Sequence, residues 1–262
     1  MTMTQNVVQE AADLLYAAQA RRTPIGPLTE RFTGLDVADA YAIQRVNLSR
    51  RLRDGHALVA HKIGLTSDPM QKLLGVDEPD FGYILDDMVL TNGAAVVATR
   101  FCAPRVEPEV AFLLREPLHG PGVTVDDVYA ATDAVAPALE IVDSRIADWK
   151  LTLPDTVADN ASSGAVVLGD WVPNCGEIDL PRARASLWLN GSEIDSGEGS
   201  AAMGDPAAAV AWLANTLASF GTEILPGQFI MSGSFTTAAF VHPGDSAATT
   251  ISGLGTVSLS FS

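Results

Sequence analysis

The sequence predicts an α+β protein whose main body is a rolled or sandwiched mixed β-sheet. Three observations predict it. Amphipathic helical segments open the chain, short strand-like runs bounded by Gly, Pro, Asn or Asp follow from about residue 57, and regular alternation of strands with helices is missing. Neither a GxGxxG nor a GxxxxGK(S/T) motif occurs, which argues against a dinucleotide-binding or P-loop fold.

The two opening helices are expected over residues 7–22 and 35–55. Apolar side chains recur at helical spacing in both, Asp36 is a candidate N-cap of the second, and glycine follows the end of each. No linker rich in Pro, Gly or Ser comes after them. We therefore expect residues 1–56 to pack as a helical segment on a catalytic β-rich domain formed by residues 57–262.

Strands dominate the rest of the chain. Two helices interrupt them: one over residues 124–135, where Thr124 and Asp127 have capping-box spacing, and one over residues 205–221, with Asp205 as N-cap. The expected strands lie within residues 57–65, 95–101, 106–114, 136–145, 163–169, 185–191, 228–234 and 247–262.

Composition limits the classes of partner. The chain has 262 residues, 47% hydrophobic and 18% charged, which is enough to bury a core in one large domain or in one domain with an appendage. It carries 16 Lys and Arg against 32 Asp and Glu, a formal net charge of -16. This charge argues against nucleic acid or an anionic membrane as a partner. A small anionic substrate stays compatible, because the charge of a site can oppose the global field.

Cysteine usage and the N-terminus indicate a cytoplasmic protein. The two cysteines, Cys102 and Cys175, form no paired-spacing motif, which suits a reducing compartment. The N-terminal stretch has no basic region followed by an apolar one, so we expect no signal peptide. No apolar run approaches the roughly 20 residues of a membrane span.

Acidic residues interrupt two runs that otherwise have the pattern of buried strands. Glu107 and Glu109 lie two residues apart in RVEPEVAFLL and so face the same side of a strand. Glu140 lies in ALEIVDSR, where Asp143 should face the other way. Clustered carboxylates repel one another, and a divalent cation such as Mg²⁺ or Mn²⁺ turns that repulsion into attraction. The pattern leaves two interpretations: a three-glutamate metal site, or acids exposed on edge strands.

Lys62 and Asp80 are further candidates. Lys62 stands in an apolar run just before a glycine. A buried lysine needs an anionic partner or a lowered pKa, and it can bind a carboxylate or carry a proton; an edge lysine that reaches solvent is the alternative. Asp80, in a Pro-flanked turn, and the hydroxyls of residues 159–164 are weaker candidates, because polar groups in turns are usually solvated. No GxSxG motif supports a nucleophilic hydrolase.

Four blocks of sequence together resemble the hydratase/decarboxylase branch of the fumarylacetoacetate hydrolase superfamily. The resemblance runs over nearly the whole chain, and agreement over four spaced blocks is specific. It implies a mixed β-roll of the fumarylacetoacetate hydrolase type with the N-terminal helices packed on it. The similarity is greatest to members that act on 2-hydroxypenta-2,4-dienoate, the enol form of 2-keto-4-pentenoate. The blocks are residues 62–88, 105–114, 138–164 and 203–215.

The resemblance also implies roles for particular residues. Catalytic residues of the family fall on Lys62 and Asp80, and a substrate-binding serine falls on Ser162, with Ser163 beside it as an alternative. Members bind Mg²⁺ or Mn²⁺ and assemble into homo-oligomers, often pentamer-based. The three metal ligands of the family fall on Glu107, Glu109 and Glu140.

The implied activity is that of a lyase in aromatic meta-cleavage catabolism. Water adds to 2-hydroxypenta-2,4-dienoate, through its 2-oxo-3-enoate tautomer, to give 4-hydroxy-2-oxopentanoate. The alternative is decarboxylation of 4-oxalocrotonate (2-oxohex-3-enedioate) at the same metal site. That reaction needs room for a second carboxylate, and the candidates to bind it are Arg100, Arg105 and Arg145.

Two other hypotheses stay open. A C–C bond hydrolase calls for a His/Glu dyad, and His56 and His61 have no obvious glutamate partner in the sequence. A catalytically silent subunit that associates with another enzyme of the pathway is the second, and the intact ligand positions argue against it.

Overall fold

The computed structural model describes residues 3–67, 69, 71–72, 75–173 and 175–262. Residues 68, 70, 73 and 74 of the 62–88 block, and residues 1–2, lie outside the described residues. The helices are α1 (Gln5–Arg21), α2 (Leu28–Arg31), α3 (Val37–Arg53), α5 (Val125–Ala131), α6 (Leu153–Ala158) and α7 (Pro206–Ala218). The strands are β1 (Leu58–Gly64), β2 (Asp80–Leu85), β3 (Val89–Thr91), β4 (Ala94–Val96), β5 (Arg105–Leu114), β6 (Thr132–Val142), β7 (Ser163–Leu168), β8 (Val172–Pro173), β9 (Arg184–Leu189), β10 (Ser192–Glu198), β11 (Phe229–Met231), β12 (Ala239–Phe240), β13 (Ser246–Ile251) and β14 (Gly255–Phe261).

A nine-stranded mixed sheet forms the centre of the molecule. Its order is β2-β1-β11-β5-β6-β7-β3, with β12 pairing β5 and β8 pairing β6. The β1–β11 and β3–β7 pairs are parallel, whereas β5 and β6 run antiparallel over their whole length. The sheet curls until β2 meets the turn before β7: a Cβ on Gly82 would lie 2.4 Å from the carbonyl oxygen of Asn160. The concave face buries a small apolar cluster that includes Ala60, Ile84, Ala111, Ala138 and Val166.

A second sheet packs on the convex face of the first. Its five strands are ordered β10-β9-β13-β14-β4, with β14 and β4 parallel. Apolar side chains from β5, β6 and β7 meet apolar side chains from β9, β13 and β14 in one core. The alternation of strand side chains thus gives the central sheet two apolar faces, one inside the curl and one against its neighbour. This second core includes Val106, Leu139, Ile141, Val167, Leu187, Val257, Leu259 and Phe261.

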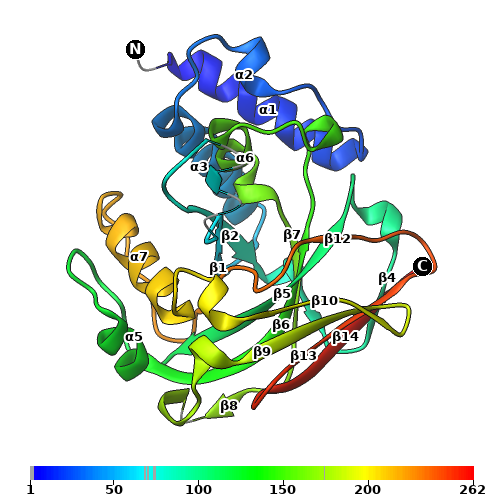
Figure 1. The fold of residues 1–262 in the computed structure, drawn as a ribbon. Coiled ribbons are helices and arrows are strands. Elements are labelled where there is room, and N and C mark those ends of the chain that lie inside the picture. The colour runs from blue at the N-terminus through cyan, green and yellow to red at the C-terminus, as the bar shows by residue number, and fades with distance from the viewer. Residues whose placement is uncertain (1–2, 68, 70, 73–74, 174) are drawn as a thin grey trace.

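The helices cover the rest of the convex face. Figure 1 shows α1, α2 and α3 gathered with α6 at one end of the sheet, and α5 and α7 beside its other side. The ring of Tyr41 in α3 stacks on Phe81 of β2, with centroids 4.6 Å apart, so the N-terminal helices share the main core. The division of the chain at residue 56 stays a prediction. No helix in the described ranges is long and apolar enough to cross a membrane.

The structure confirms the α+β class with its curled mixed sheet, and it confirms three N-caps. The side chains of Asp36, Thr124 and Asp205 each accept a hydrogen bond from a backbone amide two or three residues on. The helix expected over 124–135 is too long, because the chain after Ala131 already pairs with β5. The strand expected over 95–101 is also too long: β4 ends at Val96 and a 3-10 turn follows.

The expected turn around Asp80 is a correction of more consequence. Asp80 begins β2, every residue of which is buried, and pairs with β1. The strand has apolar contacts on both faces, so its sequence lacks the alternation of a half-buried strand. The proline and acidic residues before Asp80 favour a turn, but packing of this segment in the core makes it a strand instead.

Candidate active site

The three predicted metal ligands come together on the concave face of the central sheet. Glu107 of β5 is directly opposite Glu140 of β6, and Glu109 lies two residues along β5. Residues paired across a ladder or two apart on a strand share a face, so these side chains point the same way. One carboxylate oxygen from each lies within 4.8 Å of the others. Asp143 is directed elsewhere, as predicted, and accepts hydrogen bonds from two backbone amides of the segment before β5.

Among the described residues, few groups stabilise the negative charges of these carboxylates. Glu109 is 1% exposed and accepts one hydrogen bond, from the backbone amide of Gly233 at 2.8 Å. Glu140 is 0% exposed, and neither of its oxygens accepts a hydrogen bond from a residue that the structure describes. Burial and the neighbouring carboxylates raise the pKa of Glu109 well above its ordinary value. Burial likewise raises the pKa of Glu140, and Lys62 opposes that rise.

A divalent cation fits these residues. Three carboxylates carry a formal charge of about -3, which Mg²⁺ or Mn²⁺ would reduce to about -1 while supplying the oxygen ligands that such ions prefer. Opposite oxygens around Mg²⁺ are about 4.2 Å apart, comparable with the spread of the three carboxylate oxygens. The unpartnered oxygens of Glu140 would gain the partner that the protein does not supply.

Lys62 lies beside the glutamates and is not an edge lysine. It is 4% exposed; its Nζ donates a hydrogen bond to the Ala161 carbonyl at 2.8 Å and lies 3.5 Å from Oε2 of Glu140. Burial lowers the pKa of Lys62, but the surrounding carboxylates, Glu140 first and Asp80 next, outweigh burial and raise it. Of the two options for a buried lysine, an anionic partner or a lowered pKa, the chain provides the anionic partner.

Asp80 lies on the same concave face as Lys62. It is 1% exposed; Thr156 Oγ1 donates a hydrogen bond to its Oδ2 at 3.1 Å, and its Oδ1 has no partner within the described part of the chain. Gly64 is its partner in the β1–β2 ladder, and a Cβ there would lie 2.3 Å from Oδ1. Glycine at position 64 therefore makes room for the carboxylate. Burial raises the pKa of Asp80 and Lys62 lowers it, with burial dominant.

A strained turn closes the site from the other side. Residues Asn160, Ala161 and Ser162 have φ values of 57°, 49° and 53°, a conformation that is costly for residues other than glycine. The Asn160 side chain holds the turn, accepting from the Tyr83 amide at 2.8 Å and donating to the Tyr83 carbonyl at 2.9 Å. The turn thereby presents the Ala161 carbonyl to Lys62.

The same turn separates the two candidate serines. Ser162 lines the cavity, is 5% exposed, and its hydroxyl has no hydrogen-bond partner among the described residues. Ser163 is turned away, because its Oγ donates to the Asn160 carbonyl at 2.8 Å. Ser162 is therefore the better placed of the two to bind a ligand.

The three arginines considered for a second carboxylate have different surroundings. Arg145 forms a buried ion pair of 2.5 Å with Asp159 and also donates to backbone carbonyls. Its N–H groups therefore already have partners within the protein. Arg100 is exposed and donates to a carbonyl in the turn after β2. Arg105 lines the same cavity as Lys62.

A cavity of about 720 Å³ is lined by Lys62, Asp80, Glu107 and Ser162. Such a volume is in the range of small-molecule sites and exceeds that of a five- or six-carbon acid. The lining combines polar site residues with apolar side chains, which suits a short acid with a polar head. The lining includes Lys62, Asp80, Glu107, Ser162, Leu65, Val142, Leu151 and Phe235.

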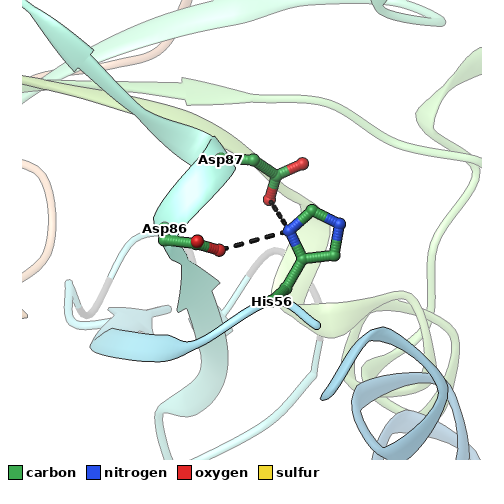
Figure 2. Close-up of side chains that lie close together, drawn as sticks. All are labelled: His56, Asp86 and Asp87. Atoms are coloured by element: carbon green, nitrogen blue, oxygen red, sulfur yellow. Dashed lines mark hydrogen bonds and ion pairs between the residues drawn. The ribbon is translucent and has the colours of Figure 1, made fainter. Parts of the chain in front are cut away.

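The histidines lie outside this cavity. Figure 2 shows His56 between two surface carboxylates: its Nδ1 is 3.2 Å from Asp86 and 3.5 Å from Asp87. Arg51 pairs with Asp87 at 2.6 Å, so this exposed group is already satisfied by its own members and one arginine. His61 points to the opposite face of β1 from Lys62 and is fully buried against the ring of Tyr83.

Several contributors to the site were not predicted from the sequence. Thr156 bonds Asp80, the amide of Gly233 bonds Glu109, and the carbonyl of Ala161 bonds Lys62. Two of these three act through backbone atoms, which have no residue-type signature. The run TLPD, residues 152–155, did carry a signal for a helix start, because Thr152 and Asp155 form a capping box at the N-terminus of α6.

Comparisons with known proteins agree with this geometry. A family model described as "Fumarylacetoacetate (FAA) hydrolase C-terminal" matches residues 51–261. The chain is 44% identical over 97% of its length to a 2-hydroxyhexa-2,4-dienoate hydratase of Comamonas testosteroni, of which it covers 97%. It is 46% identical over 84% of its length to a 2-hydroxypent-2,4-dienoate hydratase of Pseudomonas putida, of which it covers 99%. A solved structure of 4-oxalocrotonate decarboxylase from Pseudomonas putida G7, complexed with magnesium and adipate, has a TM-score of 0.97 at 36% identity and covers 100% of this chain and 99% of that one.

Cation binding should release protons, because the raised pKa values of Glu109 and Glu140 favour their protonated forms in the metal-free site. We expect the apparent affinity for Mg²⁺ or Mn²⁺ to rise with pH through about pH 7, the value to which burial raises the pKa of Glu140, and the number of protons released to fall as the pH passes it. Calorimetric titration of the metal-free protein in buffers of different ionisation enthalpy measures both.

A matched pair of variants supplies the control. Glu109→Gln removes a ligand charge at constant size and should weaken cation binding by about tenfold or more with the fold intact by circular dichroism. Glu116→Gln, on the exposed turn after β5, should bind as the wild type does. Cation affinity independent of pH, or unchanged in Glu109→Gln, would contradict the three-glutamate site.

Proposed function

The chain belongs to the fumarylacetoacetate hydrolase family, and from this premise we propose that it is a hydratase, a hydro-lyase of aromatic meta-cleavage catabolism. It adds water to 2-hydroxypenta-2,4-dienoate, through the 2-oxo-3-enoate tautomer, and gives 4-hydroxy-2-oxopentanoate. The observation that carries this proposal is the grouping of three glutamates, two of them buried, with Lys62 and Asp80 on one concave face at a cavity of suitable size. The two relatives that match most of the chain, both named as hydratases of 2-hydroxydienoates, support the choice of reaction.

We propose Mg²⁺ or Mn²⁺ as the cofactor, held by Glu107, Glu109 and Glu140. A cation bound there would act as a Lewis acid toward the carboxylate and 2-oxygen of the substrate. The magnesium in the related decarboxylase structure supports this choice. The chain's own contribution is a set of largely buried carboxylates that accept few hydrogen bonds from the described residues.

Asp80 is the proposed proton carrier. Tautomerisation removes the proton of the 2-hydroxyl and adds one at C5; hydration then adds a hydroxyl at C4 and a proton at C3. Asp80 suits these transfers because its Oδ1 is free of hydrogen bonds from the described residues and burial raises its pKa. Lys62 suits a different role, because its raised pKa keeps it an ammonium that neutralises Glu140 and orients Asp80 by charge.

Ser162 is the proposed substrate-binding hydroxyl. Its Oγ is buried at the cavity wall without a partner among the described residues, so a carboxylate or a water there would complete its hydrogen bonding. The strained turn fixes the position of this hydroxyl before any ligand arrives, which reduces the entropy lost on binding.

Decarboxylation of 2-oxohex-3-enedioate is the second candidate. The similarity to the decarboxylase structure over the whole chain favours it, as does an arginine in the cavity. The same three glutamates would hold the cation. Loss of CO₂ would take the place of the first proton transfer of the hydratase reaction. The names of the relatives make hydration the better supported reaction.

The remaining hypotheses rank lower. A C–C bond hydrolase needs a histidine at the reacting atoms, and His56 and His61 both lie away from the cavity. A silent subunit has no need of an intact ligand set. We also propose that the chain works in the cytoplasm as a homo-oligomer, pentamer-based as in the family, and that any association with a partner enzyme of the pathway is additional to its own activity.

The test of the reaction uses metal-free protein with and without added Mg²⁺. 2-Hydroxypenta-2,4-dienoate and 2-oxohex-3-enedioate are offered separately, the loss of dienoate absorbance is followed, and NMR identifies the products. We expect Mg²⁺-dependent formation of 4-hydroxy-2-oxopentanoate from the first acid. Release of CO₂ from the second acid, with no hydration of the first, would replace the hydratase by the decarboxylase.

Variants separate the roles of the two buried charged residues. Asp80→Asn should lower kcat by about 10² or more, because it removes the proton carrier at constant size. Lys62→Met should also slow turnover strongly while cation binding persists. Asp86→Asn, an exposed acid just after β2, is the control. A normal kcat in Asp80→Asn would show that the protons travel by another route.

A further inference from the structure

Arg105 occupies the position on β5 next to the metal-binding glutamates. It lies two residues before Glu107, so both side chains leave the same concave face, about 6.8 Å apart along the strand. Solvent exposure increases along β5 from Glu109 toward Arg105. Glu109 is 1% exposed, Glu107 and Arg105 are half-buried, and Phe240, the ladder partner of Arg105, is 52% exposed. Arg105 therefore marks the mouth of the cavity, and the glutamates mark its interior.

Two aromatic rings hold the guanidinium of Arg105 in place. Its Cζ lies 4.0 Å from the ring centroid of Phe240 and 4.2 Å from that of Trp149. Phe240 is the direct partner of Arg105 in the β12–β5 ladder, and Trp149 is anchored by a hydrogen bond from its Nε1 to the Ala103 carbonyl at 3.2 Å. Rings on either side of a guanidinium fix its plane and leave its edge, with the N–H donors, for a ligand.

The guanidinium has no carboxylate partner among the described residues. No ion pair or hydrogen bond of its side chain is formed within that part of the chain, and its Nε is buried without a partner. Arg145 shows the contrast, because its guanidinium is occupied by Asp159 and by backbone carbonyls. A half-buried arginine left with free donors at a cavity wall is a ready site for a carboxylate.

The acids near the mouth do not occupy this arginine. Asp195 is engaged by the backbone amide of Thr237 at 3.0 Å and by its hydroxyl at 2.6 Å. Asp148 also lines the cavity but is exposed, and solvent screens its charge. The charge of Glu107 acts on Arg105, but no ion pair or hydrogen bond joins the two side chains. The N–H donors of Arg105 therefore stay available to an anionic ligand at the mouth.

We infer that Arg105, held between Trp149 and Phe240, is a specificity-determining residue that binds the far carboxylate of dicarboxylic 2-oxo acids. The inference rests on the proposed function, in which the glutamates and their cation bind the 2-oxo acid head. Glu107 and Arg105 are two residues apart on β5, a rise of about 6.8 Å along the strand. This distance is similar to the one between the two carboxylates of an extended six- or seven-carbon diacid. The cavity then accepts a second carboxylate at the mouth as well as the unsubstituted dienoate.

The test compares two acids that differ only in the far carboxylate: 2-oxohexanedioate and 2-oxohexanoate. Both are saturated, so the binding of each to the Mg²⁺-loaded protein is measured by calorimetry without turnover. We expect the diacid to bind about tenfold or more tightly, and Arg105→Gln to remove that difference by weakening the diacid alone. Arg105→Lys, which keeps the charge and loses the planar fork, should retain part of the preference.

The control is Arg100→Gln, which removes an exposed arginine outside the cavity and should leave the ratio of affinities unchanged. Equal affinities in the wild type would overturn the inference. Equal weakening of both acids in Arg105→Gln would also overturn it, because Arg105 would then bind the head carboxylate. Failure of the proposed function looks different: neither acid would bind in a Mg²⁺-dependent manner, and the inference would fall with it.

Discussion

The mutual repulsion of three clustered carboxylates, two of them fully buried, is the interaction on which the rest of the site depends. The ladder between β5 and β6 places Glu107 against Glu140 with Glu109 next to them, and a shift of one residue would turn these side chains to the convex core. Burial makes their charges costly, and among the three Lys62 forms a close ion pair with Glu140 alone within the described residues. In the proposed function a divalent cation would supply positive charge here, and folding and cofactor binding would then use the same contacts.

The features around the glutamates serve to bring compensating groups to them. The curl of the central sheet allows the Asn160–Ser162 turn to reach Lys62, and Gly82 allows the turn to approach β2. Three left-handed residues in that turn cost on the order of 1–3 kcal/mol each, which the buried pair of Arg145 and Asp159 beneath it helps to offset. In the proposed function, this strain lies where a substrate group would meet the hydroxyl of Ser162.

Periodicity in the sequence predicted the grouping of Glu107 and Glu109, because two-residue spacing fixes a common face whatever the surrounding fold. It could not place Asp80, since the strand that carries Asp80 is buried on both faces and is preceded by turn residues. The choice between neighbouring serines depends on the left-handed backbone at Ser162, which has no signature in residue type. The sequence does not distinguish the three arginines. The fold does, because it buries Arg145 against Asp159 and places Arg105 at the cavity between two aromatic rings from distant segments.

The most direct test of the electrostatic account is equilibrium unfolding of the metal-free protein at about pH 8, with and without Mg²⁺, for the wild type and Glu109→Gln. The account predicts that the metal-free variant is the more stable of the two, because one of the repelling charges is gone. Mg²⁺ at a hundredfold excess over its Kd should then stabilise the wild type by about 2.7 kcal/mol and the variant by much less. A metal-free wild type more stable than Glu109→Gln, with no gain from Mg²⁺, would contradict it.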